Sequence, residues 1–392
     1  MTRTRLTKLA PLLVLAAALP AACSSKSSPA ADADAGTPDT SNDGSAGVDA
    51  SMFAACAPGA DGSYVDAPYP SLDAYCLVGI QDGAVVYPSS VVPYDLNTPL
   101  FSDYALKSRA VFVPPGKKAT YDPTGAFQFP TGTVLIKSFG FPEDARVSPP
   151  VMHWLETRLL VKADDGWHAY PYLWDAAGTK ATYDPGGRTL HVKWTDAKGK
   201  AFDNAYTQPA QTQCKQCHEL DAVLTPIGPK ARNLNRDHAY ATGTENQLAH
   251  WTKAGILSGA PADPATAPKL AVWNDTSLPV DTRARAYLEA NCAHCHDDTG
   301  SASTSGLFLW ASETDPLHYG VCKEPLSAGG MVGARQFDIV PGNPDLSILW
   351  FRMSSTAPGV AMPQIGRDVV DAEGLALISD WITNLPKAAC NQ

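Results

Sequence analysis

The first half of the chain carries short apolar and β-branched runs that are separated by turn sequences. In one run, Leu190, Val192 and Trp194 alternate with His191 and Lys193, which is typical of a strand with one buried and one wet face. Turns rich in Asp, Pro and Gly favour reversal of the chain between the runs. The runs cover residues 110–113, 133–137, 157–161, 167–174 and 189–194. We therefore expect an antiparallel β domain of hairpins.

The last third of the chain has apolar residues at helical spacing. We expect a helix from residue 281, with Asp281 as its N-cap, and a short helix over residues 345–353. Asp371 is the expected N-cap of a closing helix, and Pro386 ends it. This closing helix is predicted by four apolar residues at i, i+3, i+7 and i+10: Leu375, Ile378, Ile382 and Leu385. The predicted fold class is α+β and multidomain, with a β domain followed by a mostly α-helical domain.

Residues 220–280 are less regular and are expected to connect these two parts. One helix is predicted over residues 244–257, with Leu248, Trp251 and Leu257 facing inward. Proline and glycine are abundant, at 33 and 30 residues, which favours turns and short strands over long helices. The length of 392 residues suits two or three domains.

The N-terminus has the layout of an export signal. Basic residues precede an apolar run, Leu9–Leu19, that is too short for a good membrane span. Small residues then lead to Cys23 in a sequence that resembles a bacterial lipobox, whose cysteine is lipidated; plain signal cleavage is the alternative. Ser24 in place of aspartate favours attachment to the outer membrane. Residues 24–51, rich in Ser, Ala, Asp and Gly, are an expected disordered linker.

Two copies of the pattern Cys-x-x-Cys-His carry the candidate chemistry. They are Cys214-Lys215-Gln216-Cys217-His218 and Cys292-Ala293-His294-Cys295-His296. On a helical turn both thiols face the same way and can each add to one haem vinyl group, while the histidine becomes an axial ligand of the iron. The alternatives are a zinc site, although zinc knuckles usually have more closely spaced cysteine pairs, or a redox pair.

We therefore predict two covalently bound haem c groups. The attachment residues are Cys214, Cys217, Cys292 and Cys295, and the axial histidines are His218 and His296. The expected domains are residues 1–23 (signal and lipobox), 24–51 (linker), 52–219 (β domain ending in the first haem motif), 220–280 (connector) and 281–392 (domain with the second haem).

The remaining cysteines suit an oxidising compartment. Of nine, one is assigned to lipid and four to haem, which leaves Cys56, Cys76, Cys322 and Cys390. An even remainder predicts two disulfides. Sequence proximity favours Cys56–Cys76 and Cys322–Cys390, although three pairings are formally open.

The segment from Asp281 to the C-terminus resembles a small mono-haem cytochrome c domain. The likeness rests on the motif at residues 292–296, on Met362-Pro363 and on the amphipathic closing helix. The runs at residues 341–349, 362–366 and 380–382 resemble the planctomycete-type members of that family. The resemblance implies that the two terminal helices cross and that the methionine is the distal ligand.

Most of residues 70–385 also resembles an uncharacterised family of exported di-haem c-type cytochromes. The segments at residues 92–104 and 129–137 carry this likeness, which implies a cytochrome but no substrate. The β domain is more weakly similar to cytochrome P460, in which a lysine is cross-linked to the haem. Lys137 is the position to examine for such a link.

The sequence offers one preferred ligand opposite His296 but no single candidate opposite His218. For the second haem we prefer Met362, because a loop methionine before proline can project from a restricted backbone; Met353 is assigned to the core and Met331 stays open. His294 is expected to have a surface role. For the first haem an open position is the alternative to five candidates: His238, His250, His153, His168 and Met152.

These observations favour an electron carrier over a catalyst. Histidine–methionine ligation raises the reduction potential and leaves no open site, and no catalytic array is visible. The alternatives are a haem enzyme with a reactive first haem, and a binding role in which that haem only braces the fold. The net charge of −10 argues against nucleic acid and suits a basic patch on a redox partner protein. We expect a lipid-anchored, periplasmic or outer-membrane cytochrome of a Gram-negative bacterium, of open oligomeric state.

Overall fold

The computed structural model describes residues 51–54, 64, 67–327, 332–387 and 390. The predicted signal segment and linker, together with Cys23, Cys56 and Met331, lie outside the described residues. Among the residues that are described, no helix has the length and apolar character needed to cross a membrane.

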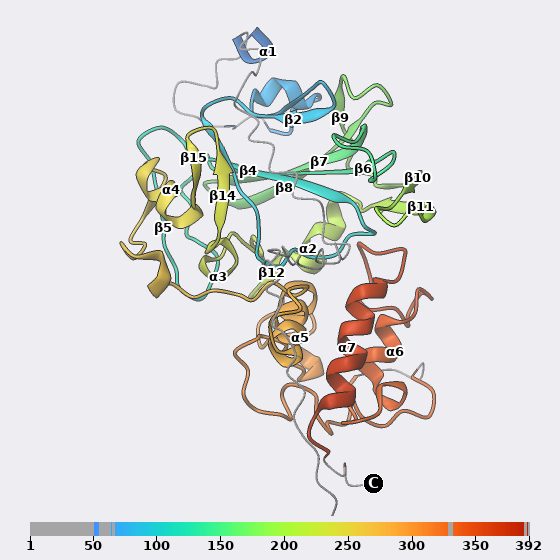
Figure 1. Cartoon of the computed structure of the whole chain (residues 1–392). Coiled ribbons are helices and arrows are strands. Elements are labelled where there is room, and N and C mark those ends of the chain that lie inside the picture. Colours follow the sequence, from blue (N-terminus) through green and yellow to red (C-terminus); the bar gives the residue numbers. More distant parts are fainter. Residues whose placement is uncertain (1–50, 55–63, 65–66, 328–331, 388–389, 391–392) are drawn as a thin grey trace, which may run out of the picture. The chain divides into compact units, whose positions relative to one another are not determined.

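Six antiparallel strands form the main sheet, in the order β3-β4-β6-β7-β8-β9 (Figure 1). Their bounds are β3 Val91–Pro93, β4 Leu106–Phe112, β6 Val134–Pro142, β7 Met152–Ala163, β8 Gly166–Trp174 and β9 Ala181–Tyr183. The predicted antiparallel β domain is therefore confirmed. A β-bulge interrupts the β6–β7 pairing at Gly140, where a Cβ would come within 2.9 Å of the His153 carbonyl oxygen, so only glycine fits there.

Five smaller sheets surround the main sheet. Four are antiparallel pairs and one, β5 with β16, is parallel. The strands are β1 Gly79–Gln81 with β2 Ala84–Val86, β10 Arg188–Thr195 with β11 Ala201–Gln208, β12 Glu219–Leu220 with β13 Val223–Leu224, β14 Asp237–Tyr240 with β15 Gly243–Asn246, and β5 Ala119–Thr120 with β16 Leu257–Ser258. In β10 the predicted alternation is confirmed, because Val192 and Trp194 are buried while His191 and Lys193 are exposed.

Side chains of β4 and β6 alternate between two hydrophobic cores. Ala110 and Ile136 belong to a core with Tyr172, whereas Val111 and Leu135 belong to another core with Trp251. Both faces of the middle of the sheet are therefore covered, which explains the continuous apolar run in β6. Because Trp251 comes from residues 220–280, the predicted connector also packs onto the sheet.

The helix predicted over residues 244–257 is wrong in its extent. The helix α4 covers only Gln247–Lys253, since the Asn246 side chain accepts a hydrogen bond from the Leu248 N–H (3.0 Å) and caps it. Gly255, with φ of +77°, then turns the chain into β16. Leu248, Trp251 and Leu257 face inward as predicted.

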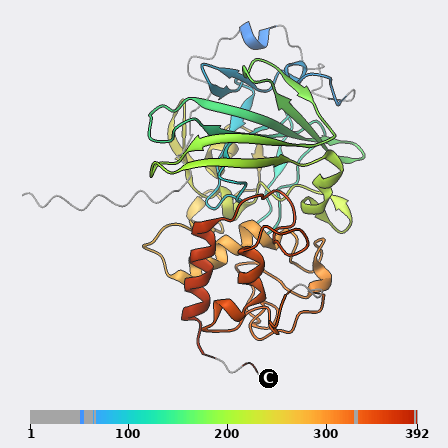
Figure 2. The same ribbon diagram turned by 90° about the vertical axis from the view of Figure 1, so that its right-hand side faces the viewer.

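Three helices pack together in residues 280–384. They are α5 (Val280–Leu288), which continues as a π-helical turn over Glu289–Ala293, α6 (Ile348–Met353) and α7 (Ala372–Asn384). Figures 1 and 2 show α6 beside α7, and their apolar faces share one core with α5. Asp371 caps α7 as predicted, by accepting a hydrogen bond from the Gly374 N–H (2.8 Å). That these helices form a cytochrome c domain stays a prediction.

The prediction that Asp281 is an N-cap is wrong. The cap position of α5 is Pro279, and Asp281 lies in the first helical turn. Its carboxylate is engaged by side chains, because it accepts hydrogen bonds from the Trp381 indole N–H (2.8 Å) and from Arg285 (3.0 Å). The aspartate therefore ties α5 to α7 and does not cap a free backbone N–H.

Candidate functional site

Residues of both Cys-x-x-Cys-His motifs line one cavity. From the first motif Cys214, Cys217 and His218 reach it, and from the second Cys292 and His294. The space between the lining atoms, including the open mouth, is about 2160 Å³. The sequence predicted two separate sites, so the joint cavity is a product of the tertiary structure.

The first motif forms one helical turn, α2 (Cys214–Cys217). The His218 N–H donates to the Cys214 carbonyl (2.9 Å), and the His218 carbonyl accepts from the Thr225 N–H (3.0 Å) across the β12–β13 hairpin. The His218 Nδ1 is buried and has no hydrogen-bond partner among the described residues. Burial first, and then the positive charge of Lys137, lowers the pKa of His218 to about 3. Its imidazole is therefore neutral near pH 7, the form that binds a metal.

The second motif begins within the π-helical turn at the end of α5, which contains Cys292 and Ala293. The His296 N–H donates to the Cys292 carbonyl (2.9 Å), which repeats the arrangement of the first motif. The His296 Nδ1 lies 3.1 Å from the Ser305 Oγ, and this contact leaves the Nε2 free to bind a metal. Burial lowers the pKa of His296 and raises that of the Cys292 thiol to about 12.

The two motifs contact each other directly. The Gln216 carbonyl accepts hydrogen bonds from the Cys295 thiol (3.4 Å) and the Ser301 hydroxyl (2.9 Å). One ligand atom each of Cys217, His294 and Cys295 lie within 4.8 Å of one another. The expected surface role of His294 is wrong, because its side chain is only 8% exposed. The spacing of the motifs in sequence contains no signal for this contact.

Two methionines line the same cavity, Met353 and Met362. Met353 is 7% exposed and packs in the core of the three helices, as its predicted core role requires. Met362 is half-buried in the loop between α6 and α7, where its N–H donates to the Arg352 carbonyl (3.1 Å). Arg367 braces this loop by donating to the Met353 carbonyl (2.8 Å). Met362 therefore lines the cavity from a loop, whereas Met353 lines it from the helical core.

The five candidates for the second ligand of the first haem do not line the cavity. His168 bonds to Asp165 (2.8 Å), and His250 bonds to Glu245 (2.6 Å) and stacks on Tyr240. His153 is exposed on the sheet. His238 packs beside Tyr240, and Met152 packs against the first core of the sheet. Lys137, the position singled out by the likeness to cytochrome P460, does line the cavity.

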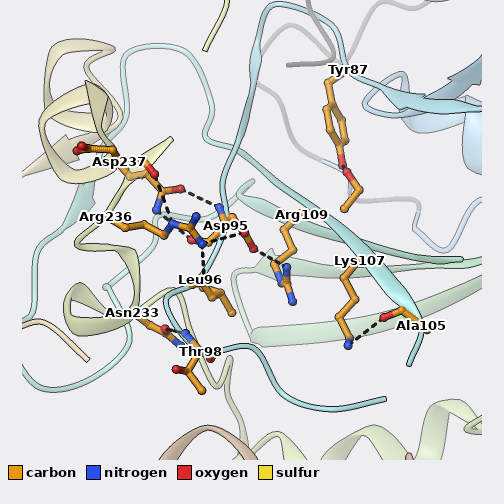
Figure 3. Close-up of polar contacts among 12 residues, drawn as sticks. Tyr87, Asp95, Leu96, Thr98, Ala105, Lys107, Arg109, Asn233, Arg236 and Asp237 are labelled. Atoms are coloured by element: carbon orange, nitrogen blue, oxygen red, sulfur yellow. Dashed lines mark hydrogen bonds and ion pairs between the residues drawn. The ribbon is translucent and has the colours of Figure 1, made fainter. Parts of the chain in front are cut away.

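Six basic side chains line the cavity: Arg109, Lys137, Arg158, Lys230, Arg232 and Arg367. Three are paired, because Arg109 meets Asp95 (3.0 Å), Arg158 meets Glu156 and Arg232 meets Glu289 (3.0 Å). Figure 3 shows Asp95 between Arg109 and Arg236, a network that holds the chain segment at residues 95–98 against the sheet.

The lysines of the cavity lack such carboxylate partners. Within the described part of the chain, Lys137 and Lys230 make no ion pair, and their ammonium groups lie over Phe139 (4.9 Å) and Trp310 (4.1 Å). Burial holds the pKa of Lys137 well below its usual range and lowers that of Lys230 to about 8. Carboxylates of a bound molecule would gain partners here.

Each motif offers two thiols and a neutral histidine, and the cavity has apolar and aromatic walls. These are the residue types that attach and ligate a haem c group. The cluster of Cys217, His294 and Cys295 supplies three ligand atoms, which is fewer than the four protein ligands of a structural zinc site.

The disulfide between Cys322 and Cys390 is present, as sequence proximity favoured. Cys76 is also disulfide-bonded. Cys214, Cys217, Cys292 and Cys295 are free thiols. Among the described cysteines, four are therefore free and three are disulfide-bonded, and haem attachment to the free ones stays a prediction.

Searches of protein families, of curated proteins and of solved structures found no match to this chain.

Proposed function

We propose that this protein is a di-haem c-type cytochrome that transfers electrons in the bacterial cell envelope. The observation that carries the proposal is the common cavity, which is lined by Cys214, Cys217 and His218 of the first motif, by Cys292 and His294 of the second, and by Met362; Cys295 and His296 of the second motif do not line it. Four free thiols at the attachment positions support it as well.

In this proposal each residue has a defined task. Cys214 and Cys217 attach one haem, and Cys292 and Cys295 attach the other, through thioether bonds. His218 and His296 would bind the two irons, and Met362 would be a further ligand of the second iron. Each bound haem supplies an iron centre that takes up or releases one electron. Ser305 orients His296, and the apolar walls keep water from the metal.

The cell envelope is proposed as the location for two reasons. The Cys322–Cys390 disulfide is stable only in an oxidising compartment. The N-terminal segment has the layout of an export signal ending at Cys23. Redox partner proteins would then meet the protein at the membrane to which Cys23 is attached by lipid.

A haem enzyme is the second candidate function, and Lys137 is the observation in its favour. Its buried amine lines the same cavity as Cys217 and His218 and has no ion pair among the described residues. The first haem would then have a reactive side equipped with a proton-carrying group. A carrier predicts that neither reduced haem binds carbon monoxide, whereas an enzyme predicts that the first one does.

The deciding experiment is expression of the full chain in a host that attaches haem c, followed by intact mass and haem quantification. We expect two covalent haems per chain. The variant Cys292→Ala/Cys295→Ala should keep one, and Cys322→Ser/Cys390→Ser should keep both, as a matched control on cysteine removal. An unmodified chain that copurifies with zinc would refute the proposal and favour the Cys217, His294 and Cys295 cluster as a metal site. Carbon monoxide added to the reduced protein then separates carrier from enzyme.

A further inference from the structure

The two motifs are far apart in sequence but meet through their second cysteines. The Sγ atoms of Cys217 and Cys295 and one nitrogen of His294 lie within 4.8 Å of one another. The Gln216 carbonyl accepts hydrogen bonds from the Ser301 hydroxyl (2.9 Å) and from the free Cys295 thiol (3.4 Å). A Cys295 thioether has no S–H to donate, so the Ser301 link is the one that would hold the junction once haem is attached. Each of the two sulfurs is an attachment atom of a different haem in the proposed function.

We propose that Cys217, Cys295 and His294 join the two haems into one coupled redox pair, in which reduction of one haem lowers the reduction potential of the other. This inference rests on the proposed function. A thioether sulfur is bonded to the former vinyl carbon that is attached to the porphyrin ring, so adjacent sulfurs would bring the two haem edges near each other. One electron can then pass from one centre, which is oxidised, to the other, which is reduced, with no bond made or broken.

The surroundings of the junction strengthen the coupling. His294 is 8% exposed and its Nδ1 has no hydrogen-bond partner among the described residues, so little water separates the two sulfurs. Charges interact more strongly in such a medium than in water. An electron on one centre therefore makes addition of the second electron less favourable, and the two reduction steps separate.

His294 and Ser301 have positioning roles in this arrangement. The imidazole lies beside both sulfurs, and the Ser301 hydroxyl fixes the loop after the second motif to the backbone of the first. The mutation Ser301→Ala removes only this hydroxyl link. Ser354→Ala is its matched control, because the Ser354 hydroxyl also donates to a backbone carbonyl at 2.9 Å, but within its own turn at the end of α6.

The test uses the full chain after mass measurement has established two covalent haems, so a failure of the proposed function is recognised first. Circular dichroism in the Soret region should show a pair of adjacent bands of opposite sign, which arises when two haems lie close together. Urea should abolish this band although both haems stay attached, because unfolding separates the motifs. The variants Ser301→Ala and His294→Leu should lose part of its amplitude and narrow the gap between the two reduction midpoints, whereas Ser354→Ala should change neither.

Paramagnetic resonance of the oxidised protein gives a second readout. Coupled haems should give signals broader than the sum of those from the single-haem variants Cys214→Ala/Cys217→Ala and Cys292→Ala/Cys295→Ala. The inference would be overturned if the folded protein holds two attached haems but its dichroism is the sum of the single-haem spectra, and if Ser301→Ala and Ser354→Ala change the reduction midpoints equally. That result would leave the cytochrome assignment intact.

Discussion

The hydroxyl of Tyr287 on α5 donates a 2.8 Å hydrogen bond to the carboxylate of Asp371, the N-cap of α7. The same ring covers Gly374, where a Cβ would overlap it. Tyr287 therefore sets both the separation and the register of the two helices, in a segment that also leads directly to the second motif.

Loss of this contact should destabilise the protein. Tyr287→Phe leaves a buried carboxylate oxygen without its donor, which costs about 1–3 kcal/mol. Gly374→Ala overpacks the crossing at a similar cost of about 1–3 kcal/mol. Urea unfolding followed by far-UV dichroism measures both, with Ala376→Gly on the exposed side of α7 as a control for helix propensity. Equal stability of Gly374→Ala and the wild type would show that the helices do not cross this closely.

Asp103 should make stability depend on pH in the acidic range. It is 1% exposed, and its carboxylate accepts hydrogen bonds from the N–H groups of Asp368 (2.7 Å) and Val369 (2.9 Å). Burial nevertheless raises the pKa of Asp103 to about 6, and the charge of Asp368 adds to the shift, while Arg367 opposes it.

The folded state thus holds a proton on Asp103 that the unfolded state releases near its ordinary pKa. Stability from this group is present at low pH and is lost as the pH rises from about 4 to about 6, by up to about 3 kcal/mol. Asp103→Asn should flatten the free energy of unfolding over that range. If the free energy of unfolding of Asp103→Asn depends on pH as it does in the wild type, groups other than Asp103 are responsible for that dependence.

Met362→Leu tests the proposed ligand of the second haem. The variant should lose the weak near-infrared absorption of methionine bound to oxidised haem iron. The reduction midpoint of the second haem should also fall, because a methionine ligand raises the potential. The reduced variant should also bind carbon monoxide at that haem. Met353→Leu, which changes another methionine of the same cavity, should leave all three properties unchanged. The reverse pattern would make Met353 the ligand.

Ser305→Ala tests the orientation of His296. The hydroxyl 3.1 Å from Nδ1 makes the imidazole a stronger electron donor toward a bound metal, so its removal should raise the midpoint of the second haem. Ser303→Ala changes the same 3-10 turn without touching the imidazole and should leave the midpoint in place. A potentiometric titration measures the midpoint of the second haem in both variants. A lower midpoint in Ser305→Ala than in the wild type would contradict this role.

Local structure was predictable where a repeating pattern and a stop signal coincide. The alternation in β10 and the spacing of Ile378 and Ile382 in α7 both describe a single buried face, so each could be read without knowing its partner. The helix over residues 244–257 failed at its ends, because Asn246 and Gly255 act as caps through a side chain and a positive φ that the apolar spacing does not report.

By itself the sequence determined the two Cys-x-x-Cys-His patterns and the antiparallel β domain, because each depends on residues close together in the chain. Only the tertiary structure decided that His218 and Cys292 line one cavity, that His294 is buried, and that Cys217 lies beside Cys295. These relations depend on how distant segments pack, and Gln216 meets Ser301 through a backbone carbonyl that every residue has. Such a contact leaves no mark in the order of the amino acids, although it joins the two motifs on which the proposed function rests.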